Sequence, residues 1–284
     1  MEIKMIRLSK KGALLSLLAL LSLGVTNSSL SAQECCDPCN SSRLYIGAFG
    51  GGIYSDSTHA YQMGTAFFTE ANGGPLAVYA HGDTKSTSAG FGGVQVGYEL
   101  SQCPMNLGCS NFSISPAFEV EAFWYKHTKK GHLINTTDRL PEHDFLDTFP
   151  MHTGVYLANV VLSFNTDCMG GFTPYIGGGI GAARISIKNA DSLQTDPPEE
   201  DVNHFNSLRN DSSWAFAAQA KVGIRYNICQ SFHVFGEYRY LFIDSSNYIF
   251  GSTVYDDHAP TSPWNVKVQN LHSNAFVFGI QYDL

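Results

Sequence analysis

Hydrophobic and polar side chains alternate along the last eleven residues of the chain, 274–284. One parity is bulky and apolar: Phe276, Phe278, Ile280, Tyr282 and Leu284. The other parity is small or polar: Ala275, Val277, Gly279, Gln281 and Asp283. Successive side chains of a strand point to opposite faces, so this segment predicts a strand with one apolar face and one face of small or polar side chains.

Seven earlier segments have comparable strand patterns. The eight predicted strands are 42–54, 90–100, 112–125, 152–164, 173–187, 214–226, 232–242 and 274–284. Each has about ten residues or a little more, which is the length that a tilted strand needs to cross a bilayer. The first strand has apolar residues in both parities, so its pattern does not show which parity faces inward.

The connections alternate between long and short. Four are long and polar: 55–89, 126–151, 188–213 and 243–273. Three are short: 101–111, 165–172 and 227–231. Barrels of the outer membrane have long extracellular loops and short periplasmic turns. The pattern therefore predicts an all-β fold, an eight-stranded antiparallel up-and-down transmembrane β-barrel over residues 42–284.

Several segments carry a family resemblance. The closing strand and the stretches PYIGGGIGA (174–182), KVGIRY (221–226) and FGEYRY (235–240) resemble parts of small bacterial outer-membrane barrels of the opacity-protein and outer-membrane-protein-A type. The resemblance covers residues 43–284, although Leu284 stands where that family most often ends in Phe. It implies a multi-pass protein of the bacterial outer membrane, in contact with outer-membrane lipid.

The amino-terminal region predicts export. Four basic residues precede the apolar run 12–25, and small residues follow up to Ala32. This order is typical of a secretory signal peptide, and an apolar run of 14 residues is too short for a spanning helix. We expect a signal peptide over 1–32, a cysteine-rich periplasmic segment over 33–41, and the barrel from residue 42.

Composition agrees with a barrel and argues against nucleic acid. Charged residues make up 15% of the chain, while 27 glycines and an aromatic content of 13% suit a lipid-facing sheet. Removal of the signal region changes the net charge from −8 to about −11, so a nucleic-acid partner is not expected.

The small or polar parity of the strands carries seven charged residues, which should face the barrel interior. They are Glu99, Glu119, Glu121, Lys221, Arg225, Glu237 and Arg239. Isolated charges in a narrow lumen are costly, so these groups should pair or hold water. Side chains just fill the interior of an eight-stranded barrel. The size of the barrel therefore favours the interpretation that these charges form a salt-bridged plug. The alternative is a narrow porin for small solutes, gated by exchange of ionic partners.

All seven cysteines fall on the predicted periplasmic side: Cys35, Cys36, Cys39, Cys103, Cys109, Cys168 and Cys229. An exported compartment permits disulfides, and an odd number leaves at least one thiol free or paired with another molecule. Local disulfides, cross-links to other envelope proteins, and a metal held by the first three cysteines remain open, the metal least favoured because no histidine lies nearby. The pattern resembles the disulfide-linked, cysteine-rich envelopes of chlamydia-like bacteria.

The histidines have the opposite distribution. Eight lie in the long connections, His152 at a strand end, and His233 near the turns; the eight are His59, His81, His127, His132, His143, His204, His258 and His272. We expect solvated surface residues and no metal site, because the spacing forms no tight ligand pattern. The alternative is capture of a transition metal or haem by neutral imidazoles. The third connection is also acidic, which indicates a solvated loop or a patch for a cationic partner or divalent ions.

No enzyme motif passes its context test. The glycine pattern 177–181 is not followed by a helix, so it does not indicate dinucleotide binding. His152 and Thr153 lie near a rim, but no serine–histidine pair is expected at cross-strand spacing, which disfavours a lipid hydrolase. We expect no enzyme activity and no cofactor. The leading hypothesis is a structural, adhesin-like scaffold whose four long loops contact host or environmental ligands.

Overall fold

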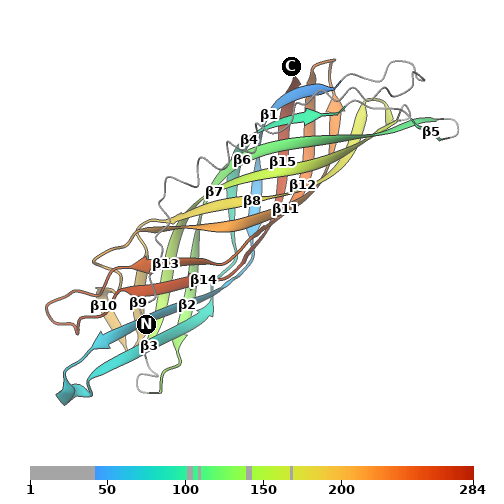
Figure 1. Cartoon of the computed structure of the whole chain (residues 1–284). Coiled ribbons are helices and arrows are strands. Elements are labelled where there is room, and N and C mark those ends of the chain that lie inside the picture. Colours follow the sequence, from blue (N-terminus) through green and yellow to red (C-terminus); the bar gives the residue numbers. More distant parts are fainter. Residues whose placement is uncertain (1–41, 101–104, 108–109, 139–142, 167–168) are drawn as a thin grey trace, which may run out of the picture. The chain divides into compact units, whose positions relative to one another are not determined.

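The barrel wall consists of eight strands. The computed structural model describes residues 42–100, 105–107, 110–138, 143–166 and 169–284. The wall strands are β1 (Arg43–Ser55), β4 (Thr87–Glu99), β6 (Ser110–Asn135), β7 (Asp144–Thr166), β8 (Phe172–Ile187), β11 (Asp211–Asn227), β12 (Phe232–Ile243) and β15 (Leu271–Asp283). Each pairs antiparallel with its neighbours, and β15 pairs with β1 to close the barrel (Figure 1). The predicted fold class is confirmed.

The closing pairing follows from the period of two in both strands. Its register runs from Tyr45 opposite Asp283 to Ser55 opposite Ser273. The apolar parity of β15 faces outward, with Phe276 and Phe278 66% and 73% exposed. The structure also shows which side chains of β1 face the lumen, a point that the sequence did not decide. Tyr45, Phe49 and Ile53 point inward and are buried.

Two wall strands are longer than predicted. The segments expected over 112–125 and 152–164 belong to β6 and β7, which have 26 and 23 residues. A barrel needs about ten residues per strand to cross the bilayer, so this hairpin continues well beyond the membrane. A short strand, β5 (Met105–Leu107), adds to β6 at its other end.

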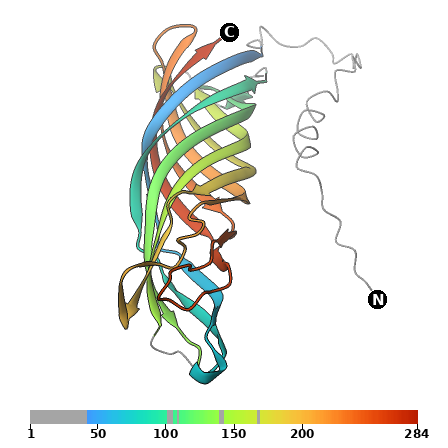
Figure 2. The same cartoon turned by 90° about the vertical axis from the view of Figure 1, so that its left-hand side faces the viewer.

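The expectation that the long connections are polar loops is wrong. They contain β2 (His59–Phe67), β3 (Pro75–Asp83), β9 (Asp191–Asp196), β10 (Pro198–Asn203), β13 (Ser246–Phe250) and β14 (Trp264–Val268), with a 3-10 turn at Glu70–Asn72. Figure 2 shows these strands gathered at the barrel end away from the carboxyl terminus. These strands were not predicted because each alternating apolar stretch is short and the connection around it is polar on average. The strands with which they pair are also far apart in the sequence.

The connections pair with one another. Strand β2 of the first connection pairs with β14 of the fourth, β3 pairs with β6, and β9 pairs with the extended part of β7. We call the resulting body the loop module: β2, β3, β9, β10, β13, β14, the segments that connect these strands to one another and to the wall, and the ends of β6 and β7 beyond the barrel. Its core contains large buried side chains, among them Leu133, Phe145, Phe149, Phe205, Tyr248, Phe250 and Trp264.

Among the described residues, no helix is both long and apolar enough to cross a bilayer. The predicted signal peptide 1–32 and cysteine-rich segment 33–41 lie outside the described residues, and both stay predictions.

Candidate functional site

The part of the barrel interior nearest the carboxyl end of β15 holds a network of paired charges. All seven charged residues predicted to point inward do so, and the structure brings them together. Lys221 Nζ lies 2.5 Å from Glu119 Oε1 and 3.6 Å from Glu121 Oε2. Arg239 binds Glu121 at 3.1 Å and also pairs with Glu237.

A second group in the same network lies nearer the turns. Arg225 Nη1 lies 3.3 Å from Glu99 Oε2, and Arg43, which the sequence did not single out, bridges Glu99 at 2.9 Å and Asp283 at 2.7 Å. Arg43 was missed because it opens the strand whose parity was ambiguous. The acid and base groups thus neutralise one another inside the wall, as burial of charge requires.

Two tyrosines complete the network because glycines make room for them. Tyr45 donates to Glu119 at 3.0 Å, and a Cβ on Gly97 would lie 2.1 Å from the Tyr45 ring. Tyr175 donates to Glu237 at 2.8 Å over Gly223 in the same manner. The remaining cavity among these groups is about 20 Å³, enough for about one water molecule.

Between the charges and the loop module, aromatic rings fill the lumen. Phe49, Phe91 and Phe123 pack edge-on with centroids 5.5 to 6.3 Å apart. The Arg239 guanidinium lies 4.3 Å from the centroid of Phe49, which couples the charged layer to the aromatic layer. The interior therefore changes from ionic to apolar toward the loop module.

The outside of the wall is apolar between two aromatic rims. Exposed Val94, Val96, Val120, Val160 and Ile180 lie between them. The rim toward the loop module includes Trp124, Tyr156, Trp214 and Tyr240, and the rim toward the turns includes Tyr98, Phe172, Tyr226 and Tyr282. Such paired girdles mark the two interfaces of a membrane. The chain is a transmembrane β-barrel of the bacterial outer-membrane type.

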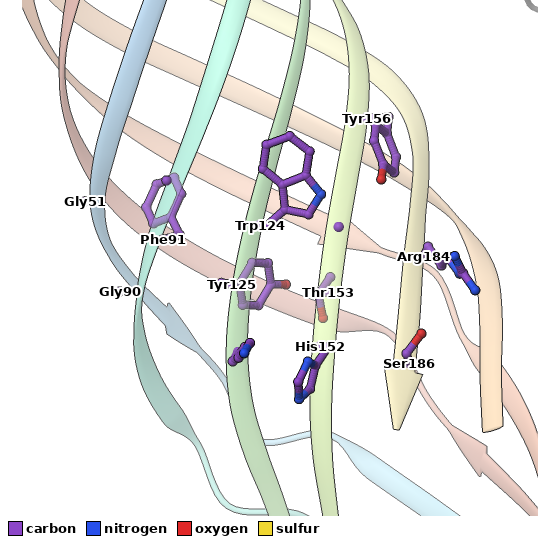
Figure 3. Close-up of a pocket in the computed structure, with 13 residues that line it drawn as sticks. Gly51, Gly90, Phe91, Trp124, Tyr125, His152, Thr153, Tyr156, Arg184 and Ser186 are labelled. Atoms are coloured by element: carbon purple, nitrogen blue, oxygen red, sulfur yellow. The ribbon is translucent and has the colours of Figure 1, made fainter. Parts of the chain in front are cut away.

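A groove lies at the loop-module rim of the wall (Figure 3). Trp124 and Tyr156 line it beside Arg184, and Lys126 continues the outward face of β6 beyond Trp124. Cations directly past an aromatic girdle lie at the level of lipid phosphates, where they interact favourably with anionic head groups.

The same groove contains a serine opposite a histidine, which the sequence interpretation did not expect. Ser186 of β8 is the cross-strand neighbour of His152 of β7. In the described structure no hydrogen bond joins the two side chains, and the charged groups acting on His152 are Lys126 and Lys188 rather than a carboxylate. Thr153 points to the opposite, buried face. The pair therefore lacks the oriented base of a serine hydrolase.

Histidines of the loop module differ from the solvated residues expected. His127 and His204 are buried, and His204 is only 3% exposed. Burial lowers the pKa of His204 to about 4, so its imidazole is neutral at physiological pH. The structure also brings Glu199, His204 and His258 together, so that one ligand atom from each lies within 4.8 Å of the others. Sequence spacing gave no signal for this cluster, because His258 comes from a different connection.

The loop module also buries an acid. Burial raises the pKa of Asp147 to about 8, and a hydrogen bond with the Ser192 side chain offsets only part of that effect. In an unfolded chain Asp titrates near pH 4. Between about pH 4 and pH 8 the folded side chain keeps a proton that the unfolded one has released, so the stability of the module falls as pH rises through this window.

Replacement of Asp147 by Asn tests this pH dependence. We expect Asp147→Asn to melt at a higher temperature than the wild type at pH 8 and at nearly the same temperature at pH 4, because the neutral amide has no proton to hold. Thermal unfolding followed by tryptophan fluorescence across this range measures the difference. Parallel curves for the two proteins would contradict the assignment.

Of the seven cysteines, the structure describes Cys229 only. It lies in the turn between β11 and β12 and is an exposed free thiol. Cys35, Cys36, Cys39, Cys103, Cys109 and Cys168 lie outside the described residues, so the disulfide pattern and the chlamydia-like envelope stay predictions.

No known protein family and no curated protein matches the sequence. Among solved structures, the chain is similar to the outer-membrane protein OprG from Pseudomonas aeruginosa, with 13% identity, 87% of this chain and 99% of that chain covered, and a TM-score of 0.44. It is also similar to neisserial surface protein A, with 14% identity, 86% and 99% coverage, and a TM-score of 0.39. Likeness at this level concerns the fold alone, and the architecture rests on the strand pairing of this chain.

Proposed function

We propose that this protein is a closed outer-membrane scaffold that presents a folded loop module to ligands outside the cell. The observation that supports this most is the pairing of all four long connections into one β-structured body, whose buried residues continue the hydrophobic cluster of the barrel interior. Binding sites are commonly formed by loops on a rigid scaffold, and here the loops themselves contain paired strands.

An aromatic face on β2 and β3 is the best candidate for the contact surface. Rings of His59, Tyr61, Tyr79 and His81 lie side by side, with neighbouring centroids 4.8 to 6.0 Å apart. Phe67 and Ile134 are exposed on the same part of the module. Tyr79 is exposed and the other three rings are half-buried, and a cluster of accessible aromatic groups is typical of interaction surfaces.

The double variant Tyr61→Ala/Tyr79→Ala tests the proposed contact surface. Cells that display the wild type should adhere to host extracellular matrix, and the double variant should adhere about tenfold less, because interface tyrosines often each contribute more than 1 kcal/mol. Trp214→Ala is the control, because it removes an aromatic ring that is more exposed than either tyrosine but belongs to the membrane girdle. Equal adherence of all three proteins, at equal surface amounts, would contradict the proposal.

The narrow-porin alternative is less well supported. A pore needs a continuous aqueous path, whereas the described interior has paired charges in one layer and packed phenylalanines in the next. A lipid hydrolase is supported still less, because His152 and Ser186 lack an orienting carboxylate.

We further propose that the turn-side cysteines link the barrel to other envelope proteins. The exposed thiol of Cys229 supports this, since a reachable thiol can exchange with a partner in an oxidising compartment.

A further inference from the structure

Three side chains of the loop module point their ligand atoms at one place. Glu199 comes from β10, His204 follows that strand directly, and His258 comes from the connection between β13 and β14. His204 Nε2 lies 3.7 Å and His258 Nε2 lies 3.3 Å from the same oxygen, Glu199 Oε2.

The tautomers of both histidines are set by their other nitrogens. His204 Nδ1 lies 3.2 Å from the carbonyl oxygen of Ser192, and His258 Nδ1 lies 2.6 Å from that of Ala259. A carbonyl can only accept, so each Nδ1 donates to it, and the Nε2 of each ring is the atom directed at Glu199 and available to a metal. Histidine ligands of metals have this arrangement, in which a backbone carbonyl orients the ring.

The converging atoms need a cation between them. Glu199 Oε2 is buried and has no hydrogen-bond partner among the described residues. A single divalent ion could bind all three ligand atoms.

The spacing fits a small transition metal. Zinc binds nitrogen and oxygen at about 2.0–2.2 Å in a tetrahedron, which separates neighbouring ligand atoms by roughly 3.4 Å. The two separations from Glu199 Oε2 are close to that value, and the third pair lies within 4.8 Å. His143, which is near enough to interact with His204, adds a buried Nδ1 without a hydrogen-bond partner among the described residues.

We propose that Glu199, His204 and His258 form a binding site for a zinc-class divalent transition metal, with His143 or water as the fourth ligand. The sequence had predicted no metal site. The ion would join the third connection to the fourth, whose neighbouring segments already meet through Asn203 and Tyr255 and through Asn206 and Val254. The site thus goes beyond the aromatic contact surface and does not depend on it.

Metal binding by the refolded mature chain, purified without a polyhistidine tag and stripped with chelator, tests the site. Titration with Zn²⁺ in a calorimeter should give one ion per chain, and Co²⁺ should give the visible bands of a tetrahedral nitrogen–oxygen complex. Glu199→Gln and His258→Ala should each weaken Zn²⁺ binding by roughly 100-fold or more, since loss of an outer-shell partner alone costs 10–100-fold.

His132→Ala is the matched control, because His132 is an exposed histidine of the same module that contacts Thr195 instead. It should bind Zn²⁺ as the wild type does. Glu199→Gln keeps the shape of the side chain, and its β-rich circular dichroism spectrum checks that it is folded. Absence of stoichiometric binding by the wild type, or equal binding by Glu199→Gln, would overturn the proposal.

Discussion

Replacement of Arg239 by Met should lower the free energy of unfolding by about 3–5 kcal/mol, which is the cost of removing one partner from a buried ion pair. The guanidinium pairs with Glu121 and Glu237 and covers the Phe49 ring. Met approximates its volume but leaves Glu237 without its cation. Urea-induced unfolding of the barrel in lipid vesicles, followed by gel mobility and fluorescence, measures the change.

Two further variants separate charge from packing in this experiment. Lys130→Met removes an exposed cation of β6 and should change stability by less than about 0.5 kcal/mol. Arg239→Met/Glu237→Gln removes the stranded carboxylate as well, and should be more stable than Arg239→Met by about 1 kcal/mol or more. A double variant no more stable than the single would mean that packing, not charge, explains the loss.

Conductance in a planar bilayer provides a second readout for the same proteins. The wild type should show no conductance, because the phenylalanine layer fills the lumen between the charges and the loop module. Arg239→Met should also remain silent, since it leaves those rings in place. Stable, salt-dependent openings of the wild type would support the porin alternative and contradict the closed scaffold.

The barrel and its inward charges could be predicted from the sequence because both follow from a local period of two. In strands with a clear alternation the apolar parity, such as Phe276 and Phe278, is assigned to lipid, and the opposite parity then faces the lumen. The alternation of residues 112–125 places Glu119 and Glu121 there. The pairing partners could not be predicted in this way. Which cation meets Glu121 depends on the positions of β11 and β12 across the lumen.

The loop module could not be predicted from the sequence because its order is non-local. A five-residue strand such as β13 has no amphipathic signal long enough to stand out from its polar surroundings. Trp264 is buried against Phe145, which lies in a different connection. The Glu199–His204–His258 cluster was missed for the same reason, since two of its ligands meet the third only after the third and fourth connections pack together.

Trp264→Ala should unfold the loop module while the barrel stays intact. Trp264 is 1% exposed, packs on Phe145 and His204, and donates from Nε1 to Thr253 at 3.2 Å. Loss of a buried tryptophan costs about 3–5 kcal/mol, which exceeds the stability expected of a small module of short strands. The barrel does not depend on this contact, because its eight strands close on one another through β1 and β15.

Limited proteolysis of the protein in vesicles measures that separation. The wild-type module should resist a protease added outside, whereas Trp264→Ala should be cut within the four connections and leave protected barrel fragments. Trp214→Ala, which removes a ring 61% exposed in the girdle, should resist cleavage like the wild type. Equal resistance of Trp264→Ala would mean that the connections are held by the barrel rim rather than by a core of their own, and equal sensitivity of the wild type would mean that they do not form a folded body.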